Sequence, residues 1–237
     1  MFCDTHSHIL FDIDDGAQSR EQSIAMLKMA CDDGIKHIIA TPHFIPGIYE
    51  LSADEIYDRV AEINVLAQEA GLDITVYPGC EISADKISFE LLSQGKIPTL
   101  CGSTYILLEL SETYTENSII NIIKTAVNMG YTPVIAHIER CISHRQGMSF
   151  VQNLVQTGAL LQINADSLVN PHIFWCQRRF IHKLLKKDLI FCVATDCHSD
   201  NMRPPVLSAA AQVLIKLTDP IRADKLLRSN PMKIIEA

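Results

Sequence analysis

Short apolar segments alternate with segments of helical periodicity along the whole chain, and this order limits the folds that the chain can adopt. The apolar segments are residues 2–5, 37–41, 74–77, 105–110, 133–136, 159–163 and 190–194. Most are too apolar to leave one face in water, which is typical of buried parallel strands. Helical patterns lie at residues 19–34, 52–70, 116–129, 147–156, 171–186 and 204–216. The alternation predicts a parallel sheet covered by helices.

Polar clusters follow these predicted strands from the first to the last. The clusters are His6-Ser7-His8, Thr41-Pro42-His43, Gly79-Cys80-Glu81, His137-Ile138-Glu139-Arg140 and Asp196-Cys197-His198. An open doubly wound sheet would keep its two ends apart, whereas a closed barrel brings them together. We therefore expect a (β/α) barrel, and 237 residues fit a single domain of this kind.

Composition and charge exclude several classes of function. The apolar fraction of 48% supports a large core, and the formal net charge of -8 disfavours nucleic acid or an anionic membrane as a partner. The same charge would repel a phosphorylated substrate unless bound cations reversed it locally. No signal sequence or membrane-spanning run is visible. The eight cysteines form no CxxC pair, which indicates a reduced, intracellular protein.

The spacing of the polar residues favours metal binding. His6 and His8 are two residues apart, so on a strand both rings point to one face, and Asp196 and His198 repeat this spacing. The alternative is a pair of packed or solvated histidines. Asp4 and Asp12 are candidates for orienting the imidazoles, although Asp12 fits a surface carboxylate better.

Four further candidates lie at strand ends, and a fifth lies in a turn. Glu109 sits within an apolar run, where a carboxylate needs a cation or a buried salt bridge. Asp15 belongs to Asp14-Asp15-Gly16, which alone indicates only a turn. The strand-end candidates are His43, Glu81, Glu109 and His137. Their joint position at successive strand ends is the signal, because barrel active sites form there.

These residues resemble the nine-ligand pattern of the PHP (polymerase and histidinol phosphatase) superfamily. The segments Asp-Thr-His-Ser-His-Ile, Asp-Ile-Asp-Asp-Gly, Ala-His-Ile-Glu-Arg and Met-Arg-Pro-Pro are similar to its bacterial manganese-dependent protein-tyrosine phosphatases of the CpsB/YwqE type. The resemblance covers nearly the whole chain. It implies one domain over residues 1–237 with a distorted (β/α)7 barrel and three divalent metal ions.

The resemblance also implies a distribution of ligands. His6, His8, Glu81 and Asp196 would hold one ion. Glu81 would bridge to a second ion, held also by Glu109 and His137. Asp15, His43 and His198 would hold the third. Nitrogen and oxygen donors suit manganese, iron or zinc without selecting one. Adjacent ions would lower the pKa of a shared water that attacks phosphorus, and Arg140 and Arg203 would grip the phosphate.

The expected substrate is phosphotyrosine on the flexible tail of a bacterial tyrosine autokinase that controls capsular or exopolysaccharide export, in the cytoplasm. The alternatives are a small-molecule phosphatase such as histidinol phosphatase, an amidohydrolase-like hydrolase, and a catalytically silent metal-binding regulator that docks to a kinase. Cys197 and Arg203 have the C-x5-R spacing of cysteine-dependent phosphatases. The segment between them lacks glycine, and two acids that flank Cys197 would raise the thiol pKa, so we disfavour that mechanism.

Two further groups have weaker claims to a functional role. His144 and Arg145 could line the substrate entrance, although a solvated loop explains them better. Trp175 lies among Phe174, Arg178 and Arg179. This aromatic and basic group could touch a substrate peptide, but we prefer an amphipathic helix that packs on the barrel.

Overall fold

The computed structural model describes residues 1–142 and 147–237. Its β segments are β1 (Phe2–Ser7), β2 (Ile35–Ala40), β3 (His43–Phe44), β4 (Thr75–Pro78), β5 (Glu81–Ser83), β6 (Tyr105–Glu109), β7 (Thr132–Ile135), β8 (Leu160–Asn164) and β9 (Cys192–Ala194). All paired strands are parallel, in the orders β1-β2-β4 and β3-β5-β6-β7-β8-β9. The seven predicted strands are therefore present.

Two of the strands are interrupted, which splits the sheet into two parts. The chain leaves β2 at Thr41 and re-enters the sheet as β3 at His43, and it leaves β4 and returns as β5 at Glu81. Pro42 has no N–H to donate, but its carbonyl accepts from Glu81 N at 3.0 Å. At Gly79 a Cβ would lie 2.8 Å from Ile39 Cγ2, so only glycine allows this close approach.

The first and last strands meet at their carboxyl ends. Ser7 forms a parallel bridge to Cys197, His8 N donates to the Cys197 carbonyl at 2.9 Å, and Asp196 N donates to the His6 carbonyl at 2.8 Å. These bonds join the end of β1 to the segment after β9, so the sheet curls round and its first and last strands come together. The predicted fold, a distorted barrel of parallel strands, is confirmed.

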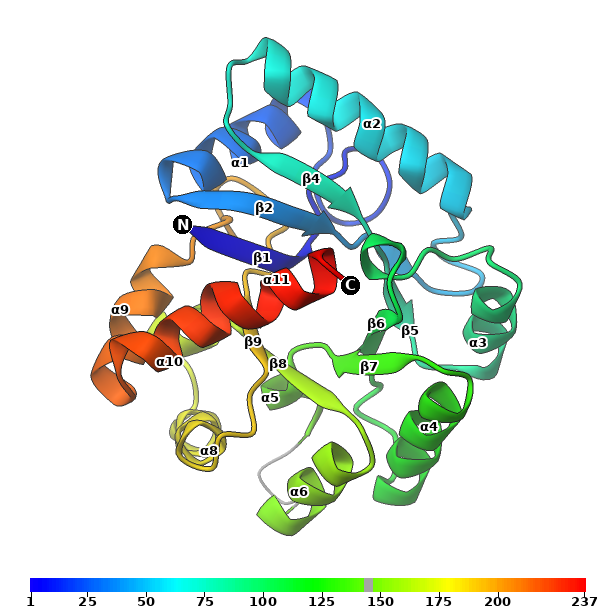
Figure 1. The fold of residues 1–237 in the computed structure, drawn as a ribbon, viewed down its shortest axis with the longest axis vertical. Coiled ribbons are helices and arrows are strands. Elements are labelled where there is room, and N and C mark those ends of the chain that lie inside the picture. Colours follow the sequence, from blue (N-terminus) through cyan, green and yellow to red (C-terminus); the bar gives the residue numbers. More distant parts are fainter. Residues whose placement is uncertain (143–146) are drawn as a thin grey trace.

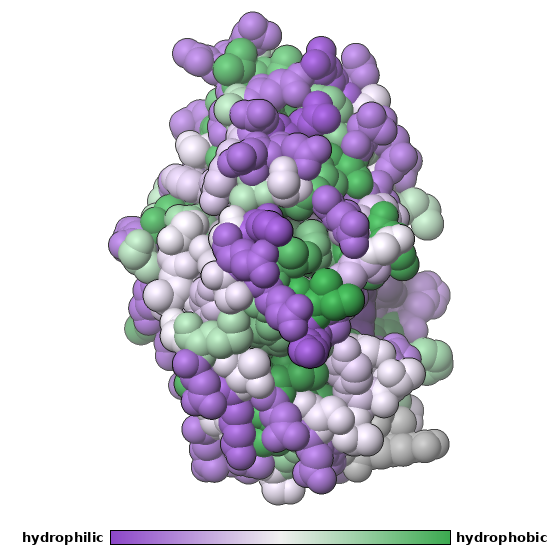
Figure 2. Space-filling view, turned by 90° about the vertical axis from the view of Figure 1, so that its right-hand side faces the viewer, coloured by the Kyte–Doolittle hydropathy of each residue, from purple (hydrophilic) through white to green (hydrophobic). Residues whose placement is uncertain are grey.

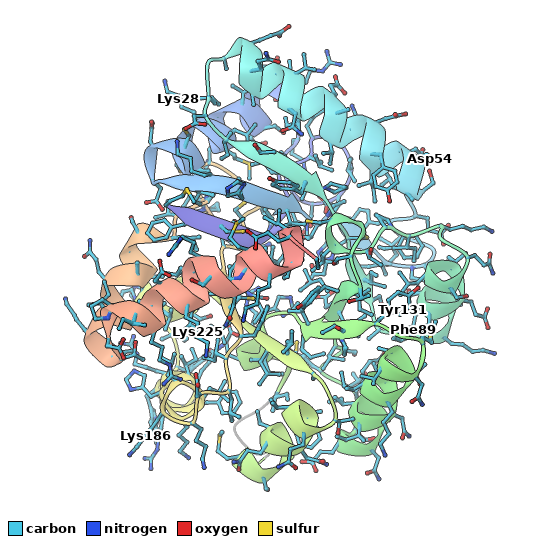
Figure 3. All side chains as sticks on the ribbon, in the orientation of Figure 1. Lys28, Asp54, Phe89, Tyr131, Lys186 and Lys225 are labelled. Atoms are coloured by element: carbon cyan, nitrogen blue, oxygen red, sulfur yellow. The ribbon has the colours of Figure 1, made fainter. Side chains whose placement is uncertain are left out.

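Helices surround the curled sheet (Figure 1). The ring comprises α1 (Arg20–Asp32), α2 (Ala53–Glu69), α3 (Lys86–Ser93), α4 (Glu116–Asn128), α6 (Met148–Gln156), α8 (Trp175–Lys186) and α9 (Ser208–Leu217). Their outward faces are polar: Lys28, Asp54 and Lys186 are exposed and point away from the sheet (Figure 3). In the part of the chain that the structure describes, no helix has the length and apolar character needed to cross a membrane.

The amino end of the barrel is closed by the C-terminal segment. Three elements, α10 (Pro220–Asp224), η2 (Lys225–Ser229) and α11 (Asn230–Ile235), run across it (Figure 1). Asn230 Nδ2 donates to the carbonyl of Phe191, just before β9, at 2.7 Å. Ile234 packs with Ile39, Leu107 and the other apolar side chains of the barrel interior. Apolar side chains thus fill the amino half of the barrel interior. The polar side chains lie at the opposite end, where the strands have their carboxyl ends.

A groove separates α3 from α4 on the outside of the ring. It has a volume of about 430 Å³ and is lined by Phe89, Ile122 and Met129 among others. Figure 2 shows hydrophobic residues gathered between hydrophilic ones on this face. The helix α3 itself was not predicted from the sequence.

Candidate metal centre

The structure brings the side chains of all nine predicted ligands together at the carboxyl end of the barrel. His6 lies at the end of β1, and His8 follows it. Glu109 ends β6, and His137 directly follows β7. The other members are Asp15 in the loop after β1, His43 in β3, Glu81 in β5, and Asp196 and His198 after β9. As expected, residues far apart in sequence meet at one place because parallel strands present their carboxyl ends on the same side.

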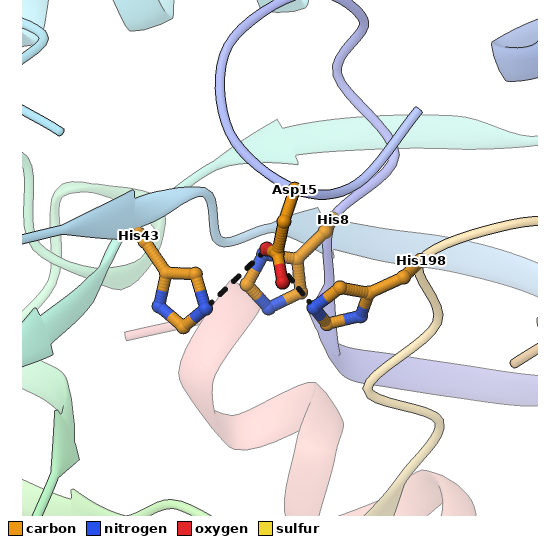
Figure 4. A group of neighbouring side chains, drawn as sticks. All are labelled: His8, Asp15, His43 and His198. Carbon is orange, nitrogen blue, oxygen red and sulfur yellow. Dashed lines mark ion pairs between the residues drawn. The ribbon is translucent and has the colours of Figure 1, made fainter. Parts of the chain in front are cut away.

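One group consists of His8, Asp15, His43 and His198, whose candidate ligand atoms lie within 4.8 Å of one another. Asp15 Oδ1 is 3.3 Å from His198 Nε2 and 3.6 Å from His43 Nε2 (Figure 4). Three of these residues are those predicted to hold one ion. His8, which the resemblance placed with another ion, stands beside them.

Glu81 lies at the middle of the cluster and is fully buried. Its Oε2 is 3.1 Å from His6 Nε2, 3.3 Å from His8 Nε2 and 3.1 Å from His43 Nδ1, while Oε1 is 3.0 Å from His137 Nε2. Burial alone would raise the pKa of Glu81, but the surrounding imidazoles, His6 first, hold it well below its usual range. A carboxylate whose two oxygens contact different imidazoles has an arrangement that suits a bridging ligand.

Glu109 and Asp196 lie beside different imidazoles of the cluster. Glu109 forms a compact group with His43 and Glu81, and its Oε1 is 3.7 Å from His137 Nε2. Asp196 Oδ1 is 3.4 Å from His6 Nε2 and 3.5 Å from His8 Nε2. The groups that the geometry defines thus overlap and share His8, His43 and Glu81.

Two buried atoms indicate that the cluster is built for cations. Among the described residues, neither His43 Nδ1 nor Glu81 Oε2 has a hydrogen-bond partner, although the two atoms are 3.1 Å apart. A buried polar atom without a partner is costly, and a bound cation would satisfy both. The candidate groups offer only imidazole nitrogen and carboxylate oxygen, a donor set that suits divalent manganese, iron or zinc.

Asp14 orients two of the imidazole-bearing residues, and the sequence analysis missed it. Its Oδ2 accepts from His8 Nδ1 at 2.7 Å and from His43 N at 2.9 Å, and its Oδ1 accepts from Gly16 N at 2.9 Å. The bond fixes the His8 tautomer with Nε2 facing the cluster. Burial alone would raise the pKa of Asp14, but the hydrogen bond to His8 and the charge of His8 lower it to about 2.

Gln162 on β8 supports two further imidazole residues. Its Oε1 lies 3.2 Å from His6 Nδ1 and accepts from His137 N at 2.8 Å. Its Nε2 donates to Asn164 Oδ1 at 2.8 Å, and Asn164 Nδ2 donates to Asp196 Oδ2 at 2.7 Å. Two amides at the i, i+2 spacing in an otherwise apolar strand were the sequence signal for this support.

Asp4 does not have the orienting role that we expected for it. Its carboxylate accepts from Thr195 N at 2.9 Å and from Thr195 Oγ1, and it also approaches His6 N at 3.4 Å. It therefore joins β1 to the end of β9 instead of touching an imidazole. Burial raises its pKa to about 6. Asp12 is an exposed loop residue, as the sequence indicated.

Both predicted phosphate-binding arginines reach the cluster through Asp196. Arg140 Nη1 is 2.9 Å and Arg203 Nη1 is 3.1 Å from Asp196 Oδ2. Their side chains are 37% and 34% exposed, so each is open to an incoming anion. Arg140 belongs to the short helix α5 (Ile138–Cys141), whereas Arg203 lies in the loop after β9.

Two of the predicted ligands have left-handed backbone conformations. His137 has φ 31° and ψ 54°, and Asp196 has φ 53°. Residues with a Cβ rarely adopt this region, and each instance costs about 1–3 kcal/mol. The Gln162 bond to His137 N and the Asp196 N bond to the His6 carbonyl hold these residues in place.

Cys197 is unsuited to act as a nucleophile. Its side chain is fully buried, and burial raises its pKa to about 12. Its backbone pairs with β1, so the C-x5-R segment forms no open phosphate loop around the thiol. His144 and Arg145 lie outside the described residues.

The model of the family described as capsular polysaccharide synthesis, CpsB/CapC, matches residues 2–236. This chain belongs to the CpsB/CapC family. The motifs had indicated this family, and the match confirms it. The tyrosine-protein phosphatase CpsB of Streptococcus pneumoniae is 34% identical over 236 residues, which is 98% of this chain and 97% of that protein.

Solved structures agree with this assignment. A crystal structure from work on YwqE of Bacillus subtilis and CpsB of Streptococcus pneumoniae, described as metal-dependent tyrosine phosphatases, has a TM-score of 0.90. It is 29% identical and covers 99% of this chain and 94% of its own. HisK from Listeria monocytogenes, a proposed histidinol phosphatase, has a TM-score of 0.54 at 11% identity. The match covers 82% of this chain and 94% of that chain, and it shows the fold alone. The expected enzyme class, a metal-dependent tyrosine phosphatase, is that of the family.

Proposed function

We propose that this protein hydrolyses phosphotyrosine on a protein substrate with the help of three divalent metal ions bound at the carboxyl end of its barrel. The observation that carries the proposal is the convergence of five imidazoles and four carboxylates around the buried Glu81, with two arginines at the edge. The tyrosine phosphatases among its relatives support the choice of substrate.

We propose the same distribution of ions that the resemblance implies, and the overlapping groups of donors in the structure are compatible with it. Asp15, His43 and His198 would hold one ion. His6, His8 and Asp196 would hold another, and Glu109 and His137 a third. Glu81 would bridge the last two. When bound, such ions supply Lewis-acid stabilisation of phosphate oxygens and an activated water as nucleophile. We propose manganese as the native metal.

The protein's own groups would bind and orient the phosphate. Arg140 and Arg203 share one oxygen of Asp196, so their remaining N–H groups can turn to the phosphate oxygens. Their positive charge also offsets the repulsion that a protein of formal charge -8 exerts on a dianionic substrate. Asp14 and Gln162 would keep the imidazoles in their binding orientation during the reaction.

We further propose that the substrate is the phosphorylated tail of a bacterial tyrosine kinase and that the reaction regulates capsular or exopolysaccharide synthesis in the cytoplasm. The family description supports the link to capsule synthesis. The eight free cysteines, five of them buried, fit a reducing compartment. A flexible tail would reach a site at the barrel mouth without a large rearrangement.

The test compares the purified protein before and after removal of its metal. Phosphotyrosine peptide and histidinol phosphate are offered in parallel, with manganese, iron or zinc restored to the stripped protein. We expect turnover of the peptide, its loss on chelation and its return with manganese. Turnover of histidinol phosphate alone would favour the small-molecule phosphatase, and metal binding without any turnover would favour the silent regulator.

A further inference from the structure

The helix α8 carries a strong positive charge on a chain that is acidic as a whole. Residues 167–187 contain five lysine or arginine residues and no acidic residue, whereas the formal net charge of the chain is -8. These five residues, which we call the basic face of α8, are all exposed: Arg178, Arg179, Lys183, Lys186 and Lys187. A surface of one sign on a chain of the other sign attracts a partner of opposite charge, here an anionic one.

The charge of the basic face is not neutralised within the protein. In the part of the chain that the structure describes, none of its five cations forms a salt bridge. The acids that bound this stretch in sequence have other partners. Asp188 is 2.9 Å from Arg222 Nη2 and 3.8 Å from Lys225 Nζ. Asp166 accepts from Asn170 Nδ2 at 3.1 Å. The helix α6, whose first residue lines a hollow beside α8, holds no charged residue. The positive charge of α8 is therefore available to a partner.

The basic face points outward because α8 packs on the barrel through its apolar face, as predicted. The buried side chains are Phe180, Ile181, Leu184 and Leu185. Phe174 and Trp175 do not take part in this packing, since they are 77% and 71% exposed. The guanidinium of Arg179 lies over the Trp175 ring, 5.6 Å from its centre. Gln177 Nε2 donates to the carbonyl of Glu139 at 3.1 Å and holds the start of α8 against α5.

Two adjoining hollows connect the metal centre to the basic face. The first has a volume of about 500 Å³ and is lined by Arg140, Cys176 and Phe180 among others. The second has a volume of about 430 Å³, and Cys176 and Phe180 line it too, together with Arg179 and Lys183. Arg140 also lies at the edge of the metal centre, where it binds a carboxylate of the cluster. A peptide whose phosphate lay at the metal centre would therefore reach α8 through these hollows.

The charges that line the hollows decide which peptide fits. Glu112 and Glu139 line the first hollow and disfavour an acidic residue directly beside the phosphotyrosine. Arg179 lines the second hollow and favours an acidic residue farther along the peptide. An anionic bilayer fits less well, because a hollow suits a chain better than a flat surface does. The helix also buries its apolar face, which leaves the rings of Phe174 and Trp175 to enter lipid.

We propose that the basic face of α8 binds an acidic segment of the substrate peptide, several residues away from the phosphotyrosine that enters the metal centre. The inference rests on the proposed phosphotyrosine hydrolysis and adds substrate selection to it. Because the contact is remote from the reacting phosphorus, it acts mainly on KM. Because the cations are exposed, the preference for an acidic segment decreases as the salt concentration rises.

The first experiment compares peptides on the manganese-loaded protein. Each peptide has one phosphotyrosine and a block of four acidic, amide or lysine residues that begins three positions before or after it. Such a block extends over about 13 Å, and the helix rises by about 10 Å from Arg179 to Lys186. At low salt we expect the acidic block to exceed the amide block by about tenfold in kcat/KM on one side, as for several exposed ion pairs together. Equal values on both sides would overturn the proposal.

Two triple variants separate the basic face from the net charge of the protein. The first, the α8 variant, combines Arg179→Gln, Lys183→Gln and Lys186→Gln. The matched control makes the same change at three exposed lysines elsewhere, Lys28, Lys96 and Lys124. We expect the α8 variant to lose the preference for the acidic block and the control to keep it. A preference retained in the α8 variant, or lost equally in both, would contradict the proposal.

The fluorescence of Trp175 gives a second readout that needs neither a variant nor turnover. Trp175 is the only tryptophan of the chain, and it lies beside Arg179. The peptides carry no tryptophan, and a phosphonate that resists hydrolysis replaces their phosphate ester. We expect the acidic peptide to change the emission and the amide peptide to leave it unchanged. Equal responses to the two peptides would contradict the proposal. A response to phosphatidylglycerol vesicles without one to the acidic peptide would overturn it in favour of a lipid-binding surface.

Phenyl phosphate separates the failure of this inference from the failure of the proposed function. It has no flanking segment, so the wild type, the α8 variant and the control should hydrolyse it alike. A selective loss in the α8 variant would contradict a contact that is remote from the metal centre. If the wild type hydrolyses neither phenyl phosphate nor any peptide, the proposed function itself fails, and the Trp175 titration still decides whether α8 binds an acidic segment.

Discussion

Replacement of Asp14 by asparagine should weaken metal binding although Asp14 is not among the predicted ligands. Asp14 accepts three hydrogen bonds, from His8 Nδ1 at 2.7 Å, His43 N at 2.9 Å and Gly16 N at 2.9 Å. An asparagine side chain has one oxygen and one NH2 group. Whichever way it turns, the NH2 group faces an N–H donor, so at least one bond is lost inside a fully buried environment.

The size of the effect follows from that count. Loss of one bond to a charged group costs about 1.5–3 kcal/mol, and tenfold in an equilibrium constant corresponds to about 1.4 kcal/mol. We therefore expect metal affinity to fall by about 10- to 100-fold, as is typical for partners of metal-binding histidines. Turnover should fall at limiting manganese and recover in part at saturating manganese, because the predicted ligands themselves remain.

The assay is a manganese titration with calorimetry and turnover on the same preparations. Asp12→Asn is the matched control, because Asp12 lies in the same loop but is exposed, and it should bind manganese like the wild type. Equal manganese affinity for the Asp14 variant and the wild type would refute the view that this carboxylate orients His8 and His43.

Three other predictions concern the metal centre and its edge. His43→Ala and His198→Ala should each remove the same equivalent of metal, since both imidazoles face Asp15 Oδ1, and the double variant should lose no further ion by metal analysis. Arg140→Ala and Arg203→Ala should each lower kcat/KM by about 100-fold while the metal content stays that of the wild type. Loss of metal together with activity would show that these arginines support the metal centre instead of binding the phosphate. Cys197→Ser should keep most activity, because the thiol is buried with a pKa of about 12. Near-total loss of activity with the metals still bound would instead favour Cys197 as the nucleophile.

The sequence was sufficient to predict the strands and the convergence of the candidate ligands. Each candidate ligand except Asp15 lies at or just beyond the end of a predicted strand, and the βα order fixes the side of the sheet at which those ends meet. His43 and Glu81 are the first residues of the short strands β3 and β5, which continue the interrupted strands. The role of Asp14 could not be predicted from the sequence, because it depends on how the loop after β1 folds back. Gly16 makes that return possible, since a Cβ there would lie 2.2 Å from the His8 carbonyl oxygen.

Other parts of the fold depend on contacts that no local pattern reveals. The helix α3 has only eight residues, too few for a clear helical repeat. The position of α11 across the barrel is set by the packing of Ile234 with strands distant in sequence. The role of Asp4 was mistaken because its side chain, unlike that of His6 on the same face of the strand, is hydrogen-bonded by Thr195, which directly follows β9.

The left-handed residues His137 and Asp196 have a consequence for protein engineering. Glycine would relieve the unfavourable torsion angles at either position, while deleting a side chain of the centre. A variant library sorted only for expression level or heat resistance would therefore enrich glycine, or asparagine, at positions 137 and 196. The selected variants would be stable but catalytically inactive. Sorting the same library for turnover should restore histidine and aspartate there.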